Sequence, residues 1–168
     1  MAPSAIDEML ADLRRLETLW AWARKVTKSE TQWLTGGYSA ADAFYAPVAS
    51  RIATYNLPVS AEAAAYVQAH LAHPSFRRWR AMGMVDGADQ EFYRRDYPRR
   101  DWPGPTPMPA RAVDGTDAEN TACPYSGKPV THALELYGRR FGFCNAFCRD
   151  KTVADPEAWP KFMALYHS

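Results

Sequence analysis

Apolar residues recur every three or four positions over the first part of the chain, a spacing typical of amphipathic helices. The first such stripe consists of Ile6, Met9, Leu10, Leu13, Leu16, Trp20 and Ala23. Just before it, Ser4 and Asp7 have the residue types and spacing of a capping box, which satisfies free amides at a helix N-terminus. The pattern therefore predicts a helix that begins after Ser4 and ends near Lys28.

A second capping box is predicted at Ser39 and Asp42, where the Asp42 carboxylate would accept a hydrogen bond from the Ser39 amide. The helix that follows would run to Tyr55. Its predicted buried face consists of Phe44, Val48 and Ile52.

Two more helices complete this region. Ser60 is placed to cap a third helix through His70, and Pro74 suits the first turn of a fourth, where its missing N–H is harmless. Their predicted inward side chains are Tyr66, Val67 and Leu71, then Phe76, Trp79 and Met82. Four helices with short connections predict a helical bundle over residues 1–85.

Residues 86–118 differ in composition, with prolines at 98, 103, 105, 107 and 109, which predicts an extended linker. Four arginines alternate with aromatic residues at its start, an arrangement that can bind single-stranded nucleic acid. Acidic residues among these arginines leave residues 91–102 with a net charge of only +1, which argues against nucleic acid. We expect instead a strap fixed to the bundle by Phe92, Tyr93, Tyr97 and Trp102.

Residues 119–168 predict a small α+β module. Two short strands, 131–136 and 139–143, flank Tyr137 and Gly138, which is a hairpin signal. A helix is expected from Asn145, and Asp155 with Pro156 would begin a last short helix that carries Trp159, Phe162, Met163 and Leu165.

The three cysteines of the chain, Cys123, Cys144 and Cys148, all lie in this module. On a helix, Cys144 and Cys148 would share one face, and two thiolates so placed can hold one zinc ion. Structural zinc takes four ligands, and His132 is our candidate for the fourth, because the neutral hydroxyl of Ser126 is a poor ligand. Three alternatives stay open: a site with an open fourth position, a remnant that binds nothing, and three reduced cysteines without a metal.

A redox role for Cys144 and Cys148 is a further alternative, because a helix N-terminus favours thiolates. Their spacing is looser than the C-x-x-C of thioredoxin-type enzymes. An odd cysteine count without a secretory signal argues against a disulfide framework and fits a reducing, cytoplasmic setting.

The bulk composition is that of a globular protein. Of 168 residues, 47% are hydrophobic and 23% charged, and the net charge of +1 gives no field that would draw the chain to nucleic acid or a membrane. No apolar run approaches the length of a membrane span.

The segment LTGGYSAADAFYAPVASRIATYN, residues 34–56, resembles the C-terminal helical domain of the glutathione S-transferase family. The matching positions are Gly37, Tyr38, Ser39, Asp42, Pro47 and Arg51, and the resemblance covers about residues 5–85. It implies a transferase-type helical bundle, with Ser39 and Asp42 as folding caps rather than catalysts.

In that family an N-terminal thioredoxin-like domain supplies most of the glutathione site and the thiol-activating residue. No position here matches such a residue, so we assign no catalytic residue to this chain. We expect glutathione-dependent transfer only if a thioredoxin-like domain completes the protein. We also expect either that domain or a second copy of the chain as a partner, because the face that the domain would cover should be apolar.

The last module resembles the small cysteine modules called TRASH or YHS domains over about residues 119–160. The matching positions are Cys123, Pro124, Ser126, Gly127, Gly138, Phe141, Phe143, Cys144, Cys148, Asp155 and Pro156. The resemblance implies a treble-clef-like fold that handles or senses metal. We therefore expect a mainly α protein, and either a transferase relative with a zinc module or a non-catalytic metal-sensing or interaction module on a transferase-like scaffold.

Overall fold

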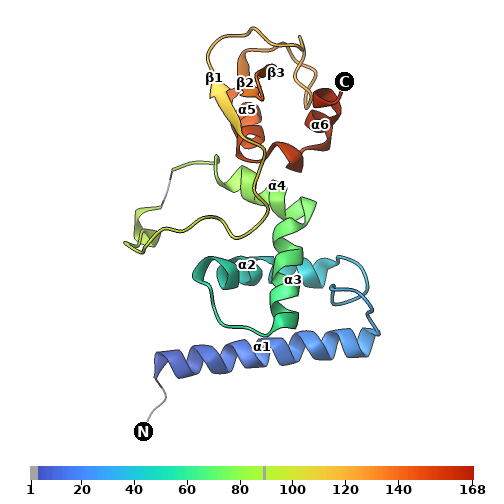
Figure 1. Ribbon diagram of the computed structural model, residues 1–168, viewed down its shortest axis with the longest axis vertical. Helices are drawn as coiled ribbons and strands as arrows, with labels where there is room; N and C mark the ends of the chain where they lie inside the picture. Colours follow the sequence, from blue (N-terminus) through green and yellow to red (C-terminus); the bar gives the residue numbers. More distant parts are fainter. Residues whose placement is uncertain (1–3, 89) are drawn as a thin grey trace. The chain divides into compact units, whose positions relative to one another are not determined.

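The computed structural model describes residues 4–88 and 90–168, with the backbone alone at Ala5. Within these residues the chain forms six α-helices, two short 3₁₀ helices and one three-stranded antiparallel sheet (Figure 1). The predicted mainly helical class is thus confirmed. Contacts divide the chain into two compact units, Met1–His73 with Trp102–Gly104, and Pro74–Asp101 with Pro105–Ser168.

The first unit contains α1 (Ala5–Thr27), α2 (Ala40–Tyr55) and α3 (Ala61–Ala72). The predicted capping box of α1 is formed, because the Asp7 amide donates to the Ser4 hydroxyl oxygen while the Ser4 amide donates to the Asp7 carboxylate. Lys28 ends the helix in the left-handed conformation, as is common after a last turn. Local sequence therefore sets the start of α1.

The carboxylate of Asp42 connects three segments of this unit. It accepts hydrogen bonds from the amide and hydroxyl of Ser39, the amide of Leu34 and the hydroxyl of Tyr66. Burial raises the pKa of Asp42, but these donors together hold it below its ordinary value. Asp42 thus caps α2 and at the same time binds the preceding loop and α3.

The predicted buried face of α2 is confirmed at Ile52 and wrong at Phe44. Trp20 makes edge contacts with Tyr45 at 5.5 Å and with Tyr66 at 4.7 Å between ring centroids. Phe44 is 83% exposed, so its predicted burial is wrong. The buried residues of α2 are Asp42, Ala49, Ile52 and Ala53. The hydrogen bonds of the Asp42 carboxylate orient this side of the helix towards the core.

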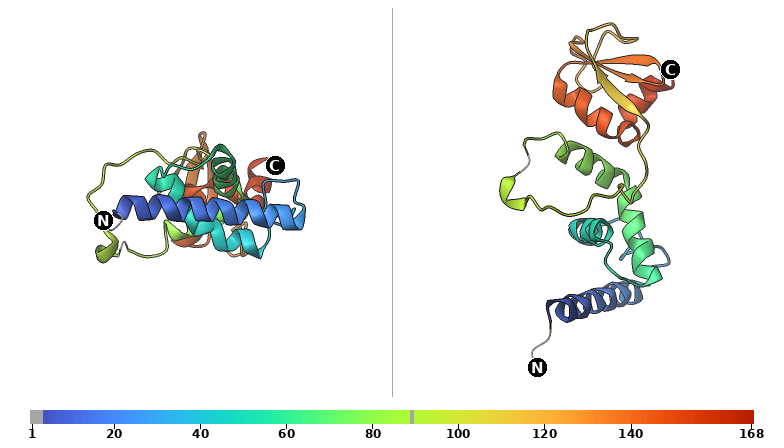
Figure 2. Two further views of the ribbon diagram at one scale, coloured as in Figure 1. Left: turned by 90° about the horizontal axis from the view of Figure 1, so that it is seen from below. Right: turned by 60° about the vertical axis from the view of Figure 1, so that its left-hand side comes forward.

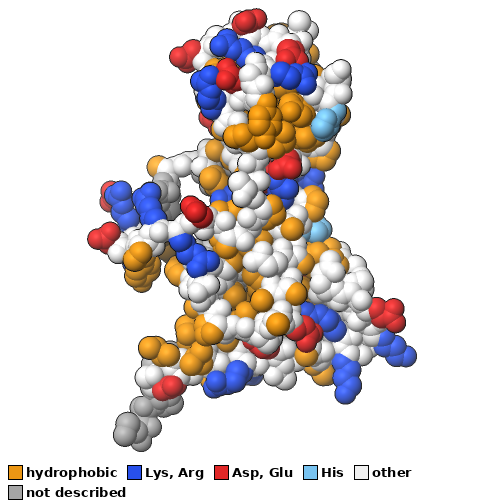
Figure 3. All heavy atoms as spheres, viewed as in Figure 1, with side chains coloured by type: hydrophobic (Ala, Val, Ile, Leu, Met, Phe, Trp, Pro, Cys, Tyr) orange, Lys and Arg blue, Asp and Glu red, His pale blue; other side chains and the backbone are white. Residues whose placement is uncertain are grey.

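Other large apolar side chains of this unit also lie at the surface (Figure 3). Ile6, predicted to face inward from α1, is 67% exposed. By contrast Leu13 and Trp20 on α1, and Tyr66, Val67 and Leu71 on α3, are buried as predicted.

His70 on α3 is completely buried, and neither of its ring nitrogens has a hydrogen-bond partner. The rings of Tyr66, Trp33 and Tyr38 surround it at centroid distances of 4.5, 5.3 and 6.0 Å. This burial lowers its pKa from 6.5 to about 4, although the Asp42 charge acts in the opposite direction. The native unit therefore holds a neutral imidazole.

Acid should destabilise the first unit through His70. A folded-state pKa below the unfolded value means that the unfolded chain binds the proton more tightly, so stability falls as pH drops from about 6.5 towards 4. We expect His70→Phe to lose this part of the pH dependence of the urea midpoint, followed by helical circular dichroism. The exposed His167→Gln is the control and should keep it. Equal pH profiles for wild type and His70→Phe would contradict the account.

The second unit begins with α4 (Pro74–Gly83), whereas the predicted bundle domain extended to residue 85. Phe76 is buried as expected, but Trp79 and Met82 are exposed, so the predicted inward face was wrong at both. A different contact holds α4: Arg77 binds Asp155 through two hydrogen bonds of 2.8 and 2.6 Å. Arg77 also reaches Glu157 at 3.1 Å, so α4 packs against the C-terminal module.

Three of the four aromatic residues predicted to fix the strap are exposed instead. Phe92, Tyr93 and Tyr97, of which the first two lie in η1 (Glu91–Tyr93), are 66%, 74% and 64% exposed. Trp102 alone is half-buried, and its segment groups with the first unit. The strap prediction is therefore wrong at Phe92, Tyr93 and Tyr97 and is not contradicted at Trp102.

The sheet contains β1 (Ala110–Val113), β2 (His132–Leu136) and β3 (Arg139–Phe143) in that order. The hairpin is confirmed: Tyr137 and Gly138 both take positive φ angles, 50° and 79°, as a two-residue hairpin turn requires. β1 was not predicted, because it lies in the proline-rich segment and pairs along one side only, with β2.

One face of the sheet forms the core of this unit. Its fully buried members are Leu134, Leu136, Phe141 and Phe143, and they pack with Trp159 and Phe162. Figure 2 shows α5 (Ala146–Ala154) and α6 (Pro160–Tyr166) beside the strands.

The last predicted helix is divided into η2 (Pro156–Ala158) and α6. Pro160 has no N–H to continue a helix, and it restricts Trp159, which is extended at φ −116° and ψ 93°. None of the helices in the described part of the chain combines the length and hydropathy that a bilayer span requires.

Candidate metal centre

The three cysteine sulfurs converge in the second unit. The Sγ atoms of Cys123, Cys144 and Cys148 all lie within 4.8 Å of one another, and none of them is in a disulfide. Around tetrahedral zinc, sulfurs would stand about 3.8 Å apart. Small side-chain movements would therefore bring all three to one ion, and the predicted convergence is confirmed.

Cys123 is held in a tight turn. Its amide donates to the carbonyl oxygen of Lys128 at 2.8 Å, and its carbonyl accepts from the Gly127 amide at 2.9 Å. Gly127 takes φ +70°, which a glycine adopts without strain. The turn leaves Cys123 only 2% exposed.

Asn120 fixes this turn beside β3. Its side-chain oxygen accepts from the Gly142 amide at 2.7 Å, and its side-chain nitrogen donates to the Gly142 carbonyl at 2.9 Å and to Ala122 at 2.8 Å. Val130 also lies over Gly142 so closely that a Cβ there would be 2.4 Å from it. Because Gly142 precedes Cys144 by two residues, these contacts bring the first cysteine to the second.

The other two cysteines lie at the start of α5. Asn145 is its N-cap, and its side-chain oxygen accepts from the Cys148 amide at 2.8 Å. The Cys144 sulfur accepts hydrogen bonds from the Ser126 hydroxyl at 3.2 Å and from the Asn145 side chain at 3.5 Å. A strand end and a helix start thus hold Cys144 and Cys148 together.

The protein environment affects these thiols unequally. Burial raises the pKa of Cys123, but the amides of Cys144, Tyr125 and Ser126 and the Ser126 hydroxyl lower it to about 7. Burial and the charges of Cys123 and Cys144 raise the pKa of Cys148 to about 11. That direction is opposite to the one an activated redox thiol needs. Neighbouring thiolates repel one another, and a bound cation would remove the repulsion.

His132 does not belong to the cluster of ligand atoms formed by the cysteines. It opens β2, and its Nδ1 lies 2.9 Å from the Thr131 hydroxyl, which in turn donates to the Cys144 carbonyl. Ser126, judged a poor ligand from its chemistry, is the residue whose hydroxyl faces the sulfurs, and it is exposed to solvent.

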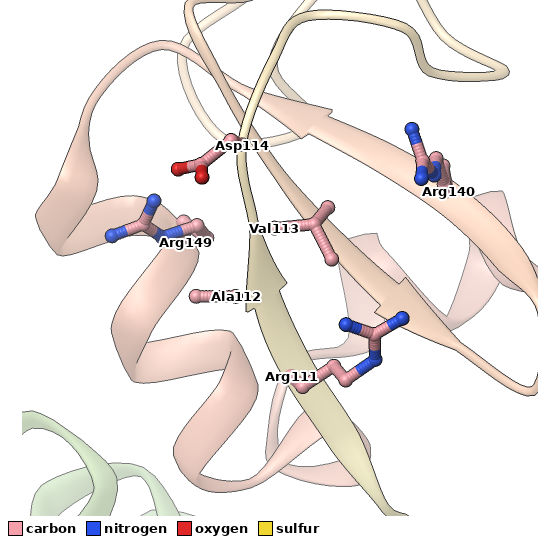
Figure 4. Close-up of a pocket in the computed structure, with 6 residues that line it drawn as sticks. All are labelled: Arg111, Ala112, Val113, Asp114, Arg140 and Arg149. Carbon is pink, nitrogen blue, oxygen red and sulfur yellow. The ribbon is translucent and has the colours of Figure 1, made fainter.

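A separate hollow of about 490 Å³ lies along β1 and is lined by Arg111, Ala112, Val113, Asp114, Arg140 and Arg149 (Figure 4). The charged side chains lie on both sides of the strand rather than converging. Arg111 binds Glu135 at 2.7 Å, and Arg149 binds Asp150 at 2.7 Å. Since these guanidinium groups are already paired, the hollow has little charge left for an anion.

Comparisons with protein-family models, with curated proteins and with solved structures found no match to this chain. The case for a metal therefore rests on the geometry of the three sulfurs. Asn120 is the supporting residue that the sequence did not reveal, because its partner Gly142 is 22 residues away and is contacted only through its backbone.

Removing the Asn120 amide should weaken metal binding without removing a ligand. We expect Asn120→Ala to lower zinc affinity about tenfold or more, as losing a residue that orients a ligand commonly does. Competition with a chromophoric chelator measures the affinity. Glu119→Ala is the control. It removes an exposed side chain that binds Arg139, but it keeps the backbone hydrogen bond from the Glu119 amide to the Arg140 carbonyl. Unchanged affinity in Asn120→Ala would show that the turn positions Cys123 unaided.

Proposed function

We propose that residues 119–168 form a zinc-binding module in which Cys123, Cys144 and Cys148 hold one ion. The observation that carries the proposal is the approach of three Sγ atoms to within 4.8 Å from two separate parts of the chain. Thiolate ligands in a tetrahedral arrangement favour zinc over harder ions such as magnesium or calcium.

The order of elements supports a treble-clef-like module related to the TRASH or YHS domains. A turn carries the first cysteine, a hairpin follows, and the remaining cysteines lie at the end of β3 and in the first turn of α5. A unit with so few strands and helices buries little apolar surface, so a metal would contribute directly to its stability. We infer a role in stabilising the unit, in sensing metal or in presenting it to a partner.

Purified protein made without added metal should contain about one zinc ion per chain. Cys123→Ser, Cys144→Ser and Cys148→Ser should each reduce the content below about 0.2 per chain, because two thiolates and a hydroxyl hold zinc poorly. Elemental analysis measures the content, and a chelator should lower the melting temperature of wild type.

His132→Gln is the matched comparison for this experiment. Its zinc content should equal that of wild type if the imidazole stays with Thr131. A loss of zinc in His132→Gln would instead establish His132 as the fourth ligand. Wild-type protein with less than about 0.2 zinc or iron per chain and no response to chelator would refute the metal site.

A glutathione S-transferase-family origin is the second proposal, for the helical unit. Its support is the Ser39–Asp42 cap of α2, in which a buried carboxylate bonds its own capping residue, Leu34 and Tyr66. A thioredoxin-like domain or a second copy would cover exposed apolar side chains either on α1 (Leu19, Trp22 and Val26) or on α2 (Phe44 and Tyr55). Sedimentation equilibrium would tell a monomer from a dimer.

Glutathione transfer would require that added domain, since an attacking thiolate needs a group that lowers its pKa. We expect this chain alone to bind glutathione with millimolar or weaker affinity in equilibrium dialysis. Micromolar binding would contradict that expectation and would locate a glutathione site within these residues.

A further inference from the structure

Ser126 occupies the place where a fourth sulfur ligand would complete the cysteine cluster. It follows Cys123 at the spacing of a C-x-x-C pair, and its hydroxyl lies 3.2 Å from the Cys144 sulfur. This hydrogen bond places the hydroxyl directly beside one of the three sulfurs. A serine hydroxyl is a weak ligand for a soft metal. The fourth coordination position, called here the corner, therefore has a side chain beside it but no strong ligand.

This corner faces solvent while the opposite side of the site is closed. Cys123 is 2% exposed, whereas Cys144 and Cys148 are partly exposed and Ser126 is exposed. A metal held by the three sulfurs would therefore be reached from the Ser126 side. Metal sites that exchange ligands keep such a position open, in contrast to closed structural sites.

One positively charged side chain lies near the cysteine cluster. Lys128 follows Ser126 in the same turn, and the Lys128 amide donates to the Ser126 hydroxyl at 3.3 Å. Lys151 lies one turn after Cys148, with its ammonium 4.4 Å from the Tyr125 ring centroid and 4.2 Å from that of Trp159. Lys151 therefore places one positive charge close enough to Cys148 to act on its thiol.

We propose that the corner marked by Ser126 is an exchangeable coordination position that binds the thiolate of an external thiol to a metal held by Cys123, Cys144 and Cys148. The inference rests on the proposed zinc site and extends it. The incoming thiol would lose its proton to solvent as the sulfur–metal bond forms and would displace water or the serine hydroxyl. No electrons are transferred, so the step needs no oxidant.

Cobalt substitution tests this directly, because sulfur-to-cobalt absorption reports the number of thiolates on the metal. The full chain loaded with Co²⁺ is titrated with 2-mercaptoethanol and, separately, with a short peptide that contains one cysteine. We expect the charge-transfer absorbance to rise by about one third, the ratio of four thiolates to three, and to saturate. A response to 2-mercaptoethanol alone would identify small thiols as the ligand. A response to both thiols would show that the position also accepts a cysteine of a partner protein.

Two variants control the experiment. Ser126→Cys should reach the four-thiolate absorbance before any thiol is added and should not respond further. Ser126→Ala keeps the fourth position open and should respond like wild type. A missing response in Ser126→Cys alone would then be due to the filled position and not to a general effect of substitution at residue 126 on folding.

The outcomes separate the two proposals. If wild type binds no Co²⁺, the metal site itself is refuted. If Co²⁺ binds but neither thiol changes the spectrum, or if Ser126→Cys responds as strongly as wild type, only the exchangeable position is overturned.

Discussion

The register of the β2–β3 hairpin is the constraint on which the metal centre depends. His132 pairs with Phe143, and the Thr131 amide donates to the Phe143 carbonyl, so the chain leaves β3 at Cys144 beside the start of β2. A shift of one residue would exchange the two faces of the sheet and expose its aromatic core. The packing that keeps Phe141 and Phe143 buried therefore also fixes where the second cysteine emerges.

The same unit uses two kinds of anchor around that hairpin. Two neutral hydrogen bonds between the Asn120 side chain and the Gly142 backbone, one in each direction, attach the Cys123 turn. A paired charge, Arg77 with Asp155, attaches α4 to the residue that follows α5. Asp155 is nearly buried, so losing its partner would leave an uncompensated charge, which is costly in a protein interior. These contacts join α4, the Cys123 turn and the hairpin without involving the cysteine sulfurs.

The helical unit shows a different use of buried polarity. Asp42 satisfies its charge with four donors, whereas His70, on the helix next to it, has no partner for either ring nitrogen. The folded unit favours the ionised form of the Asp42 carboxylate and the neutral form of the His70 imidazole. Acid therefore lowers the stability of this unit through both groups. In the helical unit the buried polar groups stabilise the fold. In the cysteine unit, by contrast, the Ser126 hydroxyl lies beside the Cys144 sulfur and is exposed to solvent.

Local sequence determined the features that need only neighbouring residues. The capping boxes at Ser4 and Ser39, the turn at Tyr137 and Gly138, and the break imposed by Pro160 all follow from backbone preferences within a few positions. The cysteine spacing likewise indicated a metal, and the sulfurs do converge.

Tertiary structure alone decided the rest. It selected Ser126 rather than His132 to face the sulfurs, added β1 from the proline-rich segment, and exposed Phe44. It also assigned α4 to the cysteine unit through Arg77 and Asp155, which are 78 residues apart. These outcomes depend on contacts between distant segments, whose energies decide which face of an element is buried, and periodicity along one segment does not contain them.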